Sequence, residues 1–236
     1  FSRVAARAVA GKNGRRDTDY EFGTNPCSEI ILRPNQFCNL TEVVVRAEDT
    51  LDTLKEKARK AAILGTLQAS PTDFRYLRSI WKKNTEEEAL LGLSLTGIMD
   101  HPVLSGDPDN APAGQSLEHW LNEMKEVAIE TNKEWAERLG INPSVAITCV
   151  KPSGTVSQLV NSVSGIHPRF APHYIRTVRA DVKDPMAQYM VAAGFPYEVD
   201  VTKDSNLVFS FPVAAPDGAV CTSDVGAMQQ LALWKT

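Results

Sequence analysis

Apolar residues recur at helical spacing over two long stretches of the chain. From Thr50 the apolar positions lie on one helix face, made of Leu51, Leu54, Ala58, Ala61 and Ala62. A longer periodic stretch follows Ser116 and ends at Gly140, with a face made of Leu117, Trp120, Leu121, Met124, Ala128 and Trp135. Serine is a favoured helix N-cap and glycine a favoured C-terminal stop, so the pattern also predicts where the second helix begins and ends.

Two shorter helices are predicted from their end signals. Thr85 and Glu88 have the spacing of a capping box ahead of an apolar run, which predicts a helix that begins at Thr85. Asp184 and Pro185 are typical of a helix start, and Gly194 closes that helix.

Two stretches have the pattern of strands. Residues 145–150 are a continuous and mainly apolar run, which favours a strand buried on both faces. Residues 207–213 alternate between core-type and outward-type side chains. Helices that alternate with short buried strands predict the α/β fold class.

The two ends of the chain indicate that it is an excerpt of a longer protein. It begins at Phe1, and its first methionine is Met99. Ser223 is expected to cap a helix that runs into Thr236 without a stop signal. The apolar face of that helix is Val225, Met228, Leu231 and Trp234. The alternative is an intact domain that has been processed or trimmed.

Composition excludes several classes of protein. The chain has 236 residues, 43% of them apolar and 23% charged, as in ordinary globular proteins. No apolar run is long enough for a transmembrane helix. The formal net charge is −4, so neither nucleic acid nor a membrane surface is an expected partner. The cysteines are too sparse for a disulfide framework and fit a reducing cytoplasm; Cys149 and Cys221 are interpreted as structural.

A thiol, an amide and a carboxylate lie within five residues, at Asn25, Cys27 and Glu29. In an extended backbone alternate side chains point the same way, and Pro26 favours an extended residue before it. The three groups would then share one site, and Cys38 follows eleven residues after Cys27. The alternative is a buried cysteine that packs as a small apolar residue, with Glu29 on the surface.

A small polar loop, 151–157, follows the predicted buried strand. A strand, a small loop and a helix start together present free backbone N–H groups, which favours an anion site. The sequence lacks the Gly-Lys-Ser/Thr ending of a P-loop. The alternative is a plain turn in which serine or threonine caps the helix. The candidate anion-binding residues are Pro152, Ser153, Gly154, Thr155, Val156 and Ser157.

Two further segments, 164–169 and 173–179, each contain one histidine, His167 and His173. Histidines at this spacing are poor metal ligands without nearby cysteine or carboxylate partners, so no metal site is predicted. Both segments are interpreted as surface loop, or as a turn packed near the anion loop.

These segments together resemble ribonucleotide reductases, most of all the monomeric, adenosylcobalamin-dependent ribonucleoside-triphosphate reductases of class II. The Asn-x-Cys-x-Glu core is common to several reductase classes. The short gap from Cys27 to Cys38, the Pro-Ser-Gly-Thr loop and the Gly-Ile-His-Pro segment favour the cobalamin type. The matching segments cover nearly the whole chain: Gly14–Asp17, Tyr20–Ile30, Cys38–Val43, Leu95–Asp100, Lys151–Ser157 and Gly165–Arg169.

The resemblance implies a fold and a domain. Residues 1–236 would be about the second half of a ten-stranded α/β barrel, truncated at both ends. A finger loop at about 22–41 would carry Cys27 to the barrel centre, and 151–157 would be the phosphate loop.

The resemblance also implies a role for each matched residue. Cys27 would carry a thiyl radical that takes hydrogen from the ribose 3′ carbon, with adenosylcobalamin as the cofactor. Glu29 would be the base for the 3′ hydroxyl, and Asn25 would hydrogen-bond the ribose hydroxyls. Cys38 would be one thiol of the pair that reduces the sugar. Residues 152–157 would hold the substrate's phosphates.

The partners that the resemblance implies are a ribonucleoside triphosphate and thioredoxin or a similar reductant. Electrons would enter through a C-terminal cysteine pair that lies beyond Thr236, and the second active-site thiol would precede Phe1. The isolated chain is therefore expected to be inactive. Three alternatives stay open: a reductase of another radical class, a non-catalytic barrel half that needs a companion chain, and a nucleotide-binding module without redox chemistry.

Overall fold

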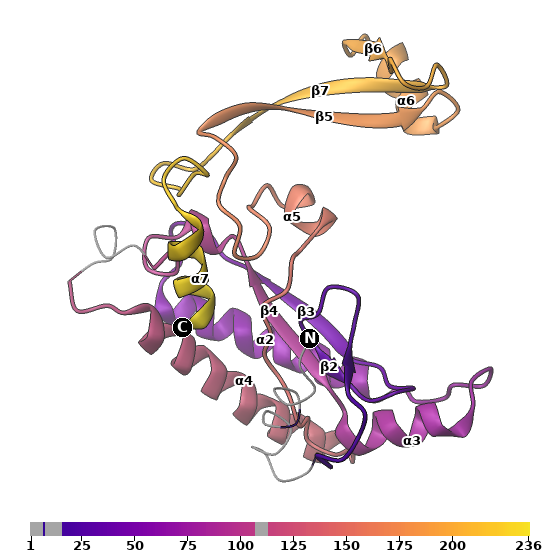
Figure 1. Ribbon diagram of the computed structural model, residues 1–236, viewed down its shortest axis with the longest axis vertical. Coiled ribbons are helices and arrows are strands. Elements are labelled where there is room, and N and C mark those ends of the chain that lie inside the picture. Colours follow the sequence, from indigo (N-terminus) through magenta and orange to yellow (C-terminus); the bar gives the residue numbers. More distant parts are fainter. Residues whose placement is uncertain (1–6, 8–15, 107–112) are drawn as a thin grey trace.

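The computed structural model describes residues 7, 16–106 and 113–236, so Gly14 and Arg15 of the first matching segment lie outside it (Figure 1). Strands and helices are mixed along the chain, in keeping with the predicted α/β class. In order they are β1 (Gly23–Thr24), β2 (Ile31–Leu32), β3 (Asn39–Val44), α2 (Leu51–Ala69), α3 (Ser79–Glu88), β4 (Leu91–Thr96), the 3₁₀ helix η1 (Ile98–Asp100), α4 (Leu117–Leu139), α5 (Thr155–Leu159), β5 (His173–Asp181), α6 (Pro185–Ala192), β6 (Tyr197–Val199), β7 (Asn206–Ala214) and α7 (Ala227–Lys235).

The main core lies where α2 packs on the parallel pair β3–β4 and α4 packs against α2. The two strands pair in register from Asn39 opposite Leu91 to Val44 opposite Thr96. Both predicted helices are confirmed, because their apolar faces are the faces that this core buries. The core includes Val43, Val45, Leu54, Ala58, Ala62, Leu93, Leu104, Trp120, Met124 and Ala128.

The ends of these two helices also form as predicted. The side-chain oxygen of Thr50 accepts from the backbone N–H of Thr53, and that of Ser116 accepts from His119. Gly140 ends α4 in the left-handed region, at φ 67°. Each cap satisfies backbone groups that a helix end leaves without partners.

The prediction that a helix begins at Thr85 is wrong, because a helix ends there. Thr85 and Glu88 belong to the last turn of α3, and Ala89 stops the helix at φ 43°. The apolar run after it forms β4, whose backbone pairs with β3. Glu88 makes no capping box, because its carboxylate is bonded to Arg16 instead.

The run 145–150 is extended but is not buried on both faces as expected. It lies beside β4: Leu93 N–H donates to the Ile147 carbonyl at 2.7 Å, and Cys149 N–H donates to the Leu93 carbonyl at 2.9 Å. Only the pair Leu93–Thr148 forms a bridge, and Val150 is 45% exposed. A continuous apolar run marks burial but does not show how many faces are covered.

A second antiparallel sheet, in the order β5–β7–β6, extends away from the main core as a long arm (Figure 1). The predicted strand in 207–213 and the predicted helix α6 are confirmed, and Leu207, Phe209 and Ala187 make the arm's own small core. Residues 173–179, interpreted as a loop, are instead in β5, which pairs with β7 along its whole length. Its β-branched residues favour a strand.

The last helix starts later than predicted. Its N-cap is Gly226, and the Ser223 hydroxyl bonds to Asp224 rather than capping a helix. Met228 and Trp234, from the expected apolar face, are exposed. In the part of the chain that the structure describes, no helix combines the length and the apolar character that crossing a membrane requires.

Candidate active site

Asn25, Cys27 and Glu29 lie in one tight loop between β1 and β2, which pair as an antiparallel hairpin. The Asn25 side-chain oxygen accepts from the Ile30 N–H at 3.0 Å, and the Asn25 carbonyl accepts from the Ser28 N–H at 3.0 Å. Ser28 adopts a left-handed φ of 65°. The expected extended backbone is therefore wrong: the chain turns here, and it is the turn that brings the three residues close together.

Glu29 is the most buried functional group of the loop. Its side chain is 1% exposed, and its Oε1 lies 3.2 Å from Nζ of Lys151. Burial raises the pKa of the Glu29 carboxyl, but hydrogen bonds from its own backbone N–H, from Asn25 and from Lys151 outweigh burial, so the pKa lies below its usual range. Within the described residues, Oε2 has no hydrogen-bond partner.

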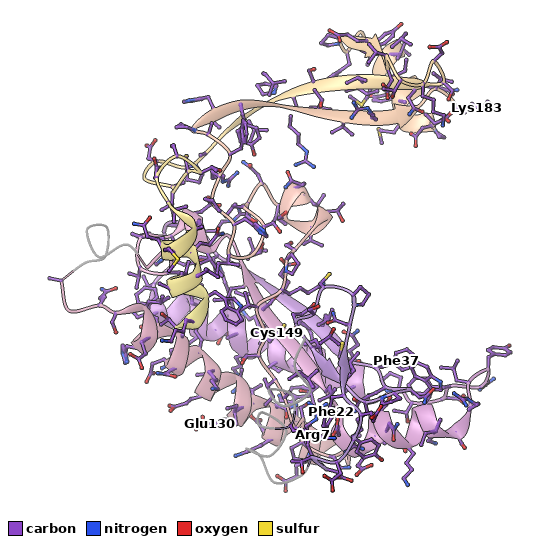
Figure 2. All side chains as sticks on the ribbon, in the orientation of Figure 1. Arg7, Phe22, Phe37, Glu130, Cys149 and Lys183 are labelled. Carbon is purple, nitrogen blue, oxygen red and sulfur yellow. The ribbon has the colours of Figure 1, made fainter. Side chains whose placement is uncertain are left out.

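Two cysteines lie close enough to this carboxylate for its charge to raise their pKa values, Cys38 and Cys149, and Cys27 lies two residues before it in the same loop. Cys27 is exposed, while Cys38 and Cys149 are half-buried. Burial, together with the charge of Glu29, raises the pKa of the Cys38 thiol. Burial, followed by Glu29 and Cys38, raises the pKa of Cys149 to about 12, so this thiol stays protonated at neutral pH. In Figure 2, Cys149 lies beside the β3–β4 pair.

The candidate phosphate loop ends in the short helix α5. Its N-cap, Gly154, has φ 62° and provides no side-chain cap. The Ser157 hydroxyl donates to the Gly154 carbonyl at 2.7 Å and so does not cap the first turn. The plain capped turn is therefore not what forms. One predicted donor is already used, since the Ser153 N–H donates to the Ser164 hydroxyl at 2.9 Å.

The segment behind this loop is fixed to the end of β4. The Thr96 hydroxyl donates to the Val163 carbonyl at 2.9 Å and accepts from the Gly165 N–H at 2.9 Å. Arg169 makes a buried two-pronged ion pair with Asp100, with both N–O distances at 2.7 Å. These bonds hold residues 163–169 as a rigid support for the phosphate loop.

Gly165 packs closely against the backbone of Lys151. It adopts φ 51°, and a Cβ there would lie 2.6 Å from the Lys151 carbonyl oxygen. We expect Gly165→Ala to lower the free energy of unfolding by about 2–3 kcal/mol, since it adds left-handed strain to a backbone clash. Urea denaturation measures the change.

Gly218 is the matched control for this substitution. It has φ 76°, and the space that a Cβ would occupy there is open. Gly218→Ala is expected to lose only the strain component, about 1 kcal/mol. Equal losses in the two variants would show that the Lys151 contact is unimportant.

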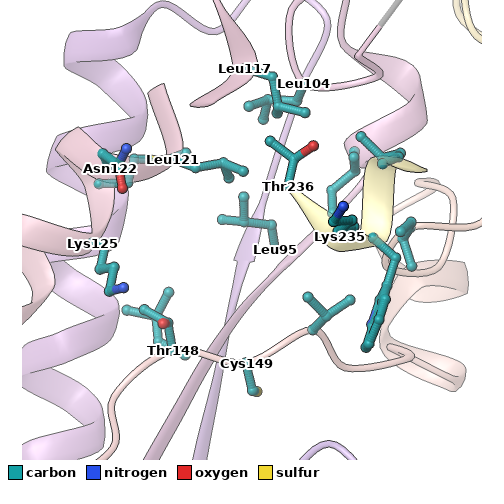
Figure 3. Close-up of a pocket in the computed structure, with 17 residues that line it drawn as sticks. Leu95, Leu104, Leu117, Leu121, Asn122, Lys125, Thr148, Cys149, Lys235 and Thr236 are labelled. Atoms are coloured by element: carbon teal, nitrogen blue, oxygen red, sulfur yellow. The ribbon is translucent and has the colours of Figure 1, made fainter. Parts of the chain in front are cut away.

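The cavity shown in Figure 3 adjoins the cysteine–carboxylate cluster only through Cys149. It measures about 360 Å³ and lies between β4, α4, α7 and the 148–150 segment, with Leu95, Leu121 and Cys149 among its lining residues. Cys27, Glu29 and Lys151 do not line it. Among the described residues, no group of three or more His, Cys, Asp or Glu side chains is arranged to hold a metal ion.

Comparison with known proteins identifies the relatives of this chain. No family model matches it. The adenosylcobalamin-dependent ribonucleoside-triphosphate reductase of Lactobacillus acidophilus is 31% identical over 235 residues, and that of Lactobacillus leichmannii is 29% identical; each match covers 91% of this chain. A solved B12-dependent (class II) ribonucleotide reductase superposes with a TM-score of 0.68 at 26% identity, over 89% of this chain and 32% of that one.

The chain is homologous to part of a class II ribonucleotide reductase. It spans about a third of the length of the curated relatives that it matches, 31% of each of the two named. The resemblance found in the motifs is thus confirmed. The strands that the structure describes form two pairs and one three-stranded sheet, so the expected ten-stranded barrel and finger loop are not seen in them.

Two residues that support the hairpin loop or its strands are not predicted as functional groups by the motifs. The sequence pattern marks Lys151 only as the start of the phosphate loop, and Glu88 only as a helix cap. Both act through partners that are distant in sequence: Lys151 pairs with Glu29, and Glu88 pairs with Arg16. The one local signal is the position of Lys151 at the start of the loop.

Proposed function

We propose that this chain is the part of an adenosylcobalamin-dependent ribonucleoside-triphosphate reductase that contains the radical cysteine and the general base. The observation that carries the proposal is one hairpin loop that contains both Cys27 and a buried, ion-paired Glu29, together with Cys38, whose pKa is raised in part by the charge of that carboxylate. This cluster occurs in a chain that is homologous to those reductases.

Cys27 is proposed as the site of the thiyl radical. Its thiol is exposed, which leaves room for a bulky cofactor to approach the sulfur. Adenosylcobalamin, when bound, supplies the radical that removes the thiol hydrogen. The Cys27 sulfur then takes hydrogen from the ribose 3′ carbon, and the hairpin fixes where that sulfur lies.

Glu29 is proposed as the base for the 3′ hydroxyl. Its low pKa keeps it ionised at neutral pH, and its buried Oε2 has no hydrogen-bond partner among the described residues, so this is the oxygen that we propose accepts the hydroxyl proton. The Asn25 side-chain oxygen is occupied by the Ile30 N–H, and its amide nitrogen also donates to Glu29, so Asn25 offers its remaining amide N–H. That donor would orient the ribose hydroxyls.

Cys38 is proposed as one reducing thiol. Its raised pKa keeps it protonated, which suits a group that must give hydrogen to the sugar as the 2′ hydroxyl leaves as water. The second thiol of the pair, and the thioredoxin-type reductant that restores both, would come from outside this chain. Residues 152–157 are proposed to hold the phosphates through backbone N–H groups.

The fold belongs to the same proposal. Residues 1–236 would form about half of a ten-stranded barrel that acts in the cytoplasm, with the hairpin loop inside the finger loop at about 22–41. The parallel pair β3–β4, extended by residues 145–150, would supply neighbouring barrel strands.

The choice of radical source tests the proposal. A complete reductase that contains these residues is supplied with a ribonucleoside triphosphate, dithiothreitol and adenosylcobalamin, and the deoxynucleotide is measured by chromatography. We expect product with adenosylcobalamin as the sole radical source and none when it is left out. Product formed equally without it would place the chain in another radical class.

A further inference from the structure

Lys151 lies where the proposed phosphate loop begins, yet its side chain points to a different group. Its Nζ lies 3.2 Å from Oε1 of Glu29, although 122 residues separate the two in sequence. The lysine side chain is 27% exposed, while the carboxylate is 1% exposed. A buried carboxylate paired with a half-buried ammonium interacts more strongly than two surface charges would.

The backbone at Lys151 is held in place by residues 163–165. Its carbonyl oxygen is packed so closely against Gly165 that a Cβ there would be 2.6 Å away. The Ser153 N–H is bonded to Ser164, and Thr96 holds both neighbours of Ser164. The ammonium is therefore held by an anchored backbone, unlike that of a lysine on a free surface.

Among the described residues, thiols are the other ionisable groups that influence this pair. Cys27 and Cys149 contribute to the raised pKa of Lys151, and the charge of Glu29 contributes to the raised pKa values of Cys38 and Cys149. Lys151 is the cation that acts on Glu29.

We propose that Lys151 is a positioning residue that ties the general base Glu29 to the phosphate-binding residues 152–157. This inference rests on the proposed role of Glu29. Lys151 holds one carboxylate oxygen and leaves the other for the ribose hydroxyl. The same backbone continues into the phosphate loop, so the base and the phosphate site keep a fixed separation. A bound nucleotide, which spans both sites, would thus meet a base that is already placed.

The direction of the effect of removing Lys151 follows from burial. In Lys151→Gln the carboxylate stays buried but loses its cation, so the pKa of Glu29 is expected to rise by about one unit or more. Since the base acts in its ionised form, the acid limb of the pH–rate profile would move to higher pH by the same amount. Lys151→Arg keeps the charge and should restore most of the shift.

Lys55 provides a matched control. It forms an ion pair with Glu123 at 2.6 Å, and its side chain is 32% exposed. Lys55→Gln therefore removes a similarly exposed paired lysine that lies on α2, away from the cysteine cluster. It is expected to leave the titration of Glu29 unchanged.

The experiment is a titration of the Glu29 carboxyl by ¹³C NMR in protein labelled at glutamate, with the resonance assigned through Glu29→Gln. The three lysine variants are compared with the unchanged protein, and pH–rate profiles are recorded on a complete reductase. A higher Glu29 midpoint in Lys151→Gln, largely restored in Lys151→Arg, is the expected result. An unchanged midpoint, or the same rise in Lys55→Gln, would overturn the inference, as would a raised midpoint with an unmoved acid limb.

The two proposals fail separately. The carboxyl titration needs no turnover, so it tests the Lys151–Glu29 tie even if the unchanged protein reduces no nucleotide. Absence of reduction in the unchanged protein counts against the proposed function, whereas a Glu29 midpoint that is indifferent to Lys151 counts against the tie.

Discussion

Cys27→Ser is expected to abolish ribonucleotide reduction, with a loss of at least about a thousand-fold, as for removal of other reacting side chains. The hydroxyl that replaces the thiol cannot form a sulfur radical, so hydrogen abstraction from the ribose stops. The fold should not change, because the Cys27 side chain is exposed and the substitution alters one atom. Deoxynucleotide formation in a complete reductase measures the loss, and urea denaturation checks stability.

Ser28→Ala is the control in the same loop. Ser28 is also exposed, and its hydroxyl makes only a long contact, 3.4 Å, to Thr24. This variant is expected to keep most of the activity. Retained turnover in Cys27→Ser would contradict the radical role of Cys27. An equal loss of activity in Ser28→Ala would show that the loss is not specific to the Cys27 thiol.

Glu88→Ala is expected to lower the free energy of unfolding by about 3–5 kcal/mol, as when one partner of a buried ion pair is removed. The Glu88 side chain is 0% exposed, and its carboxylate lies 2.9 Å from Arg16 and 2.7 Å from Arg33, both of them buried. Its loss would leave the buried Arg16 without its carboxylate partner, and the buried Arg33 with only the half-exposed Glu87. Urea denaturation measures the change.

The effect would reach the hairpin that holds Cys27. Arg16 also donates to the carbonyl of Ile31 in β2 at 2.7 Å, and it stacks over Phe22 at 5.0 Å. Glu88 thus fixes the β1–β2 hairpin to the junction between α3 and β4. We expect Glu88→Ala to lose activity along with stability.

Glu87 supplies the matched control for Glu88. It pairs with Arg33 at 3.0 Å, but its side chain is 47% exposed. Glu87→Ala should cost less than about 1 kcal/mol, because water screens exposed pairs. A loss in Glu88→Ala no larger than that in Glu87→Ala would contradict the structural role of the network.

Apolar periodicity and capping residues were enough to predict the helices whose ends depend on neighbouring residues. Helices α2 and α4 have long apolar faces and side-chain caps at Thr50 and Ser116, so neighbouring residues were enough to predict them. The turn at Thr85 was different. A threonine followed three residues later by glutamate suits a helix start, but Glu88 is buried against arginines that are about 55 and 72 residues away in sequence. Tertiary contacts decided that boundary.

In the candidate site, too, the residues close in sequence were predicted and the contacts distant in sequence were not. Asn25, Cys27 and Glu29 were predicted together because they are neighbours in sequence, although the backbone that gathers them is a turn and not a strand. The ion pair between Lys151 and Glu29 spans 122 residues, so no local pattern pointed to it. Strand β5 was missed because its partner β7 lies beyond an intervening helix and strand.

The most direct test of the central claim is electron paramagnetic resonance of a complete reductase frozen during turnover with adenosylcobalamin and a ribonucleoside triphosphate. The protein is prepared with ordinary cysteine and with cysteine deuterated at the β carbon. A radical signal that narrows on deuteration, and that is absent from Cys27→Ser, is the predicted result. A signal whose width is unchanged by deuteration, or one that persists in Cys27→Ser, would contradict a radical on the Cys27 sulfur.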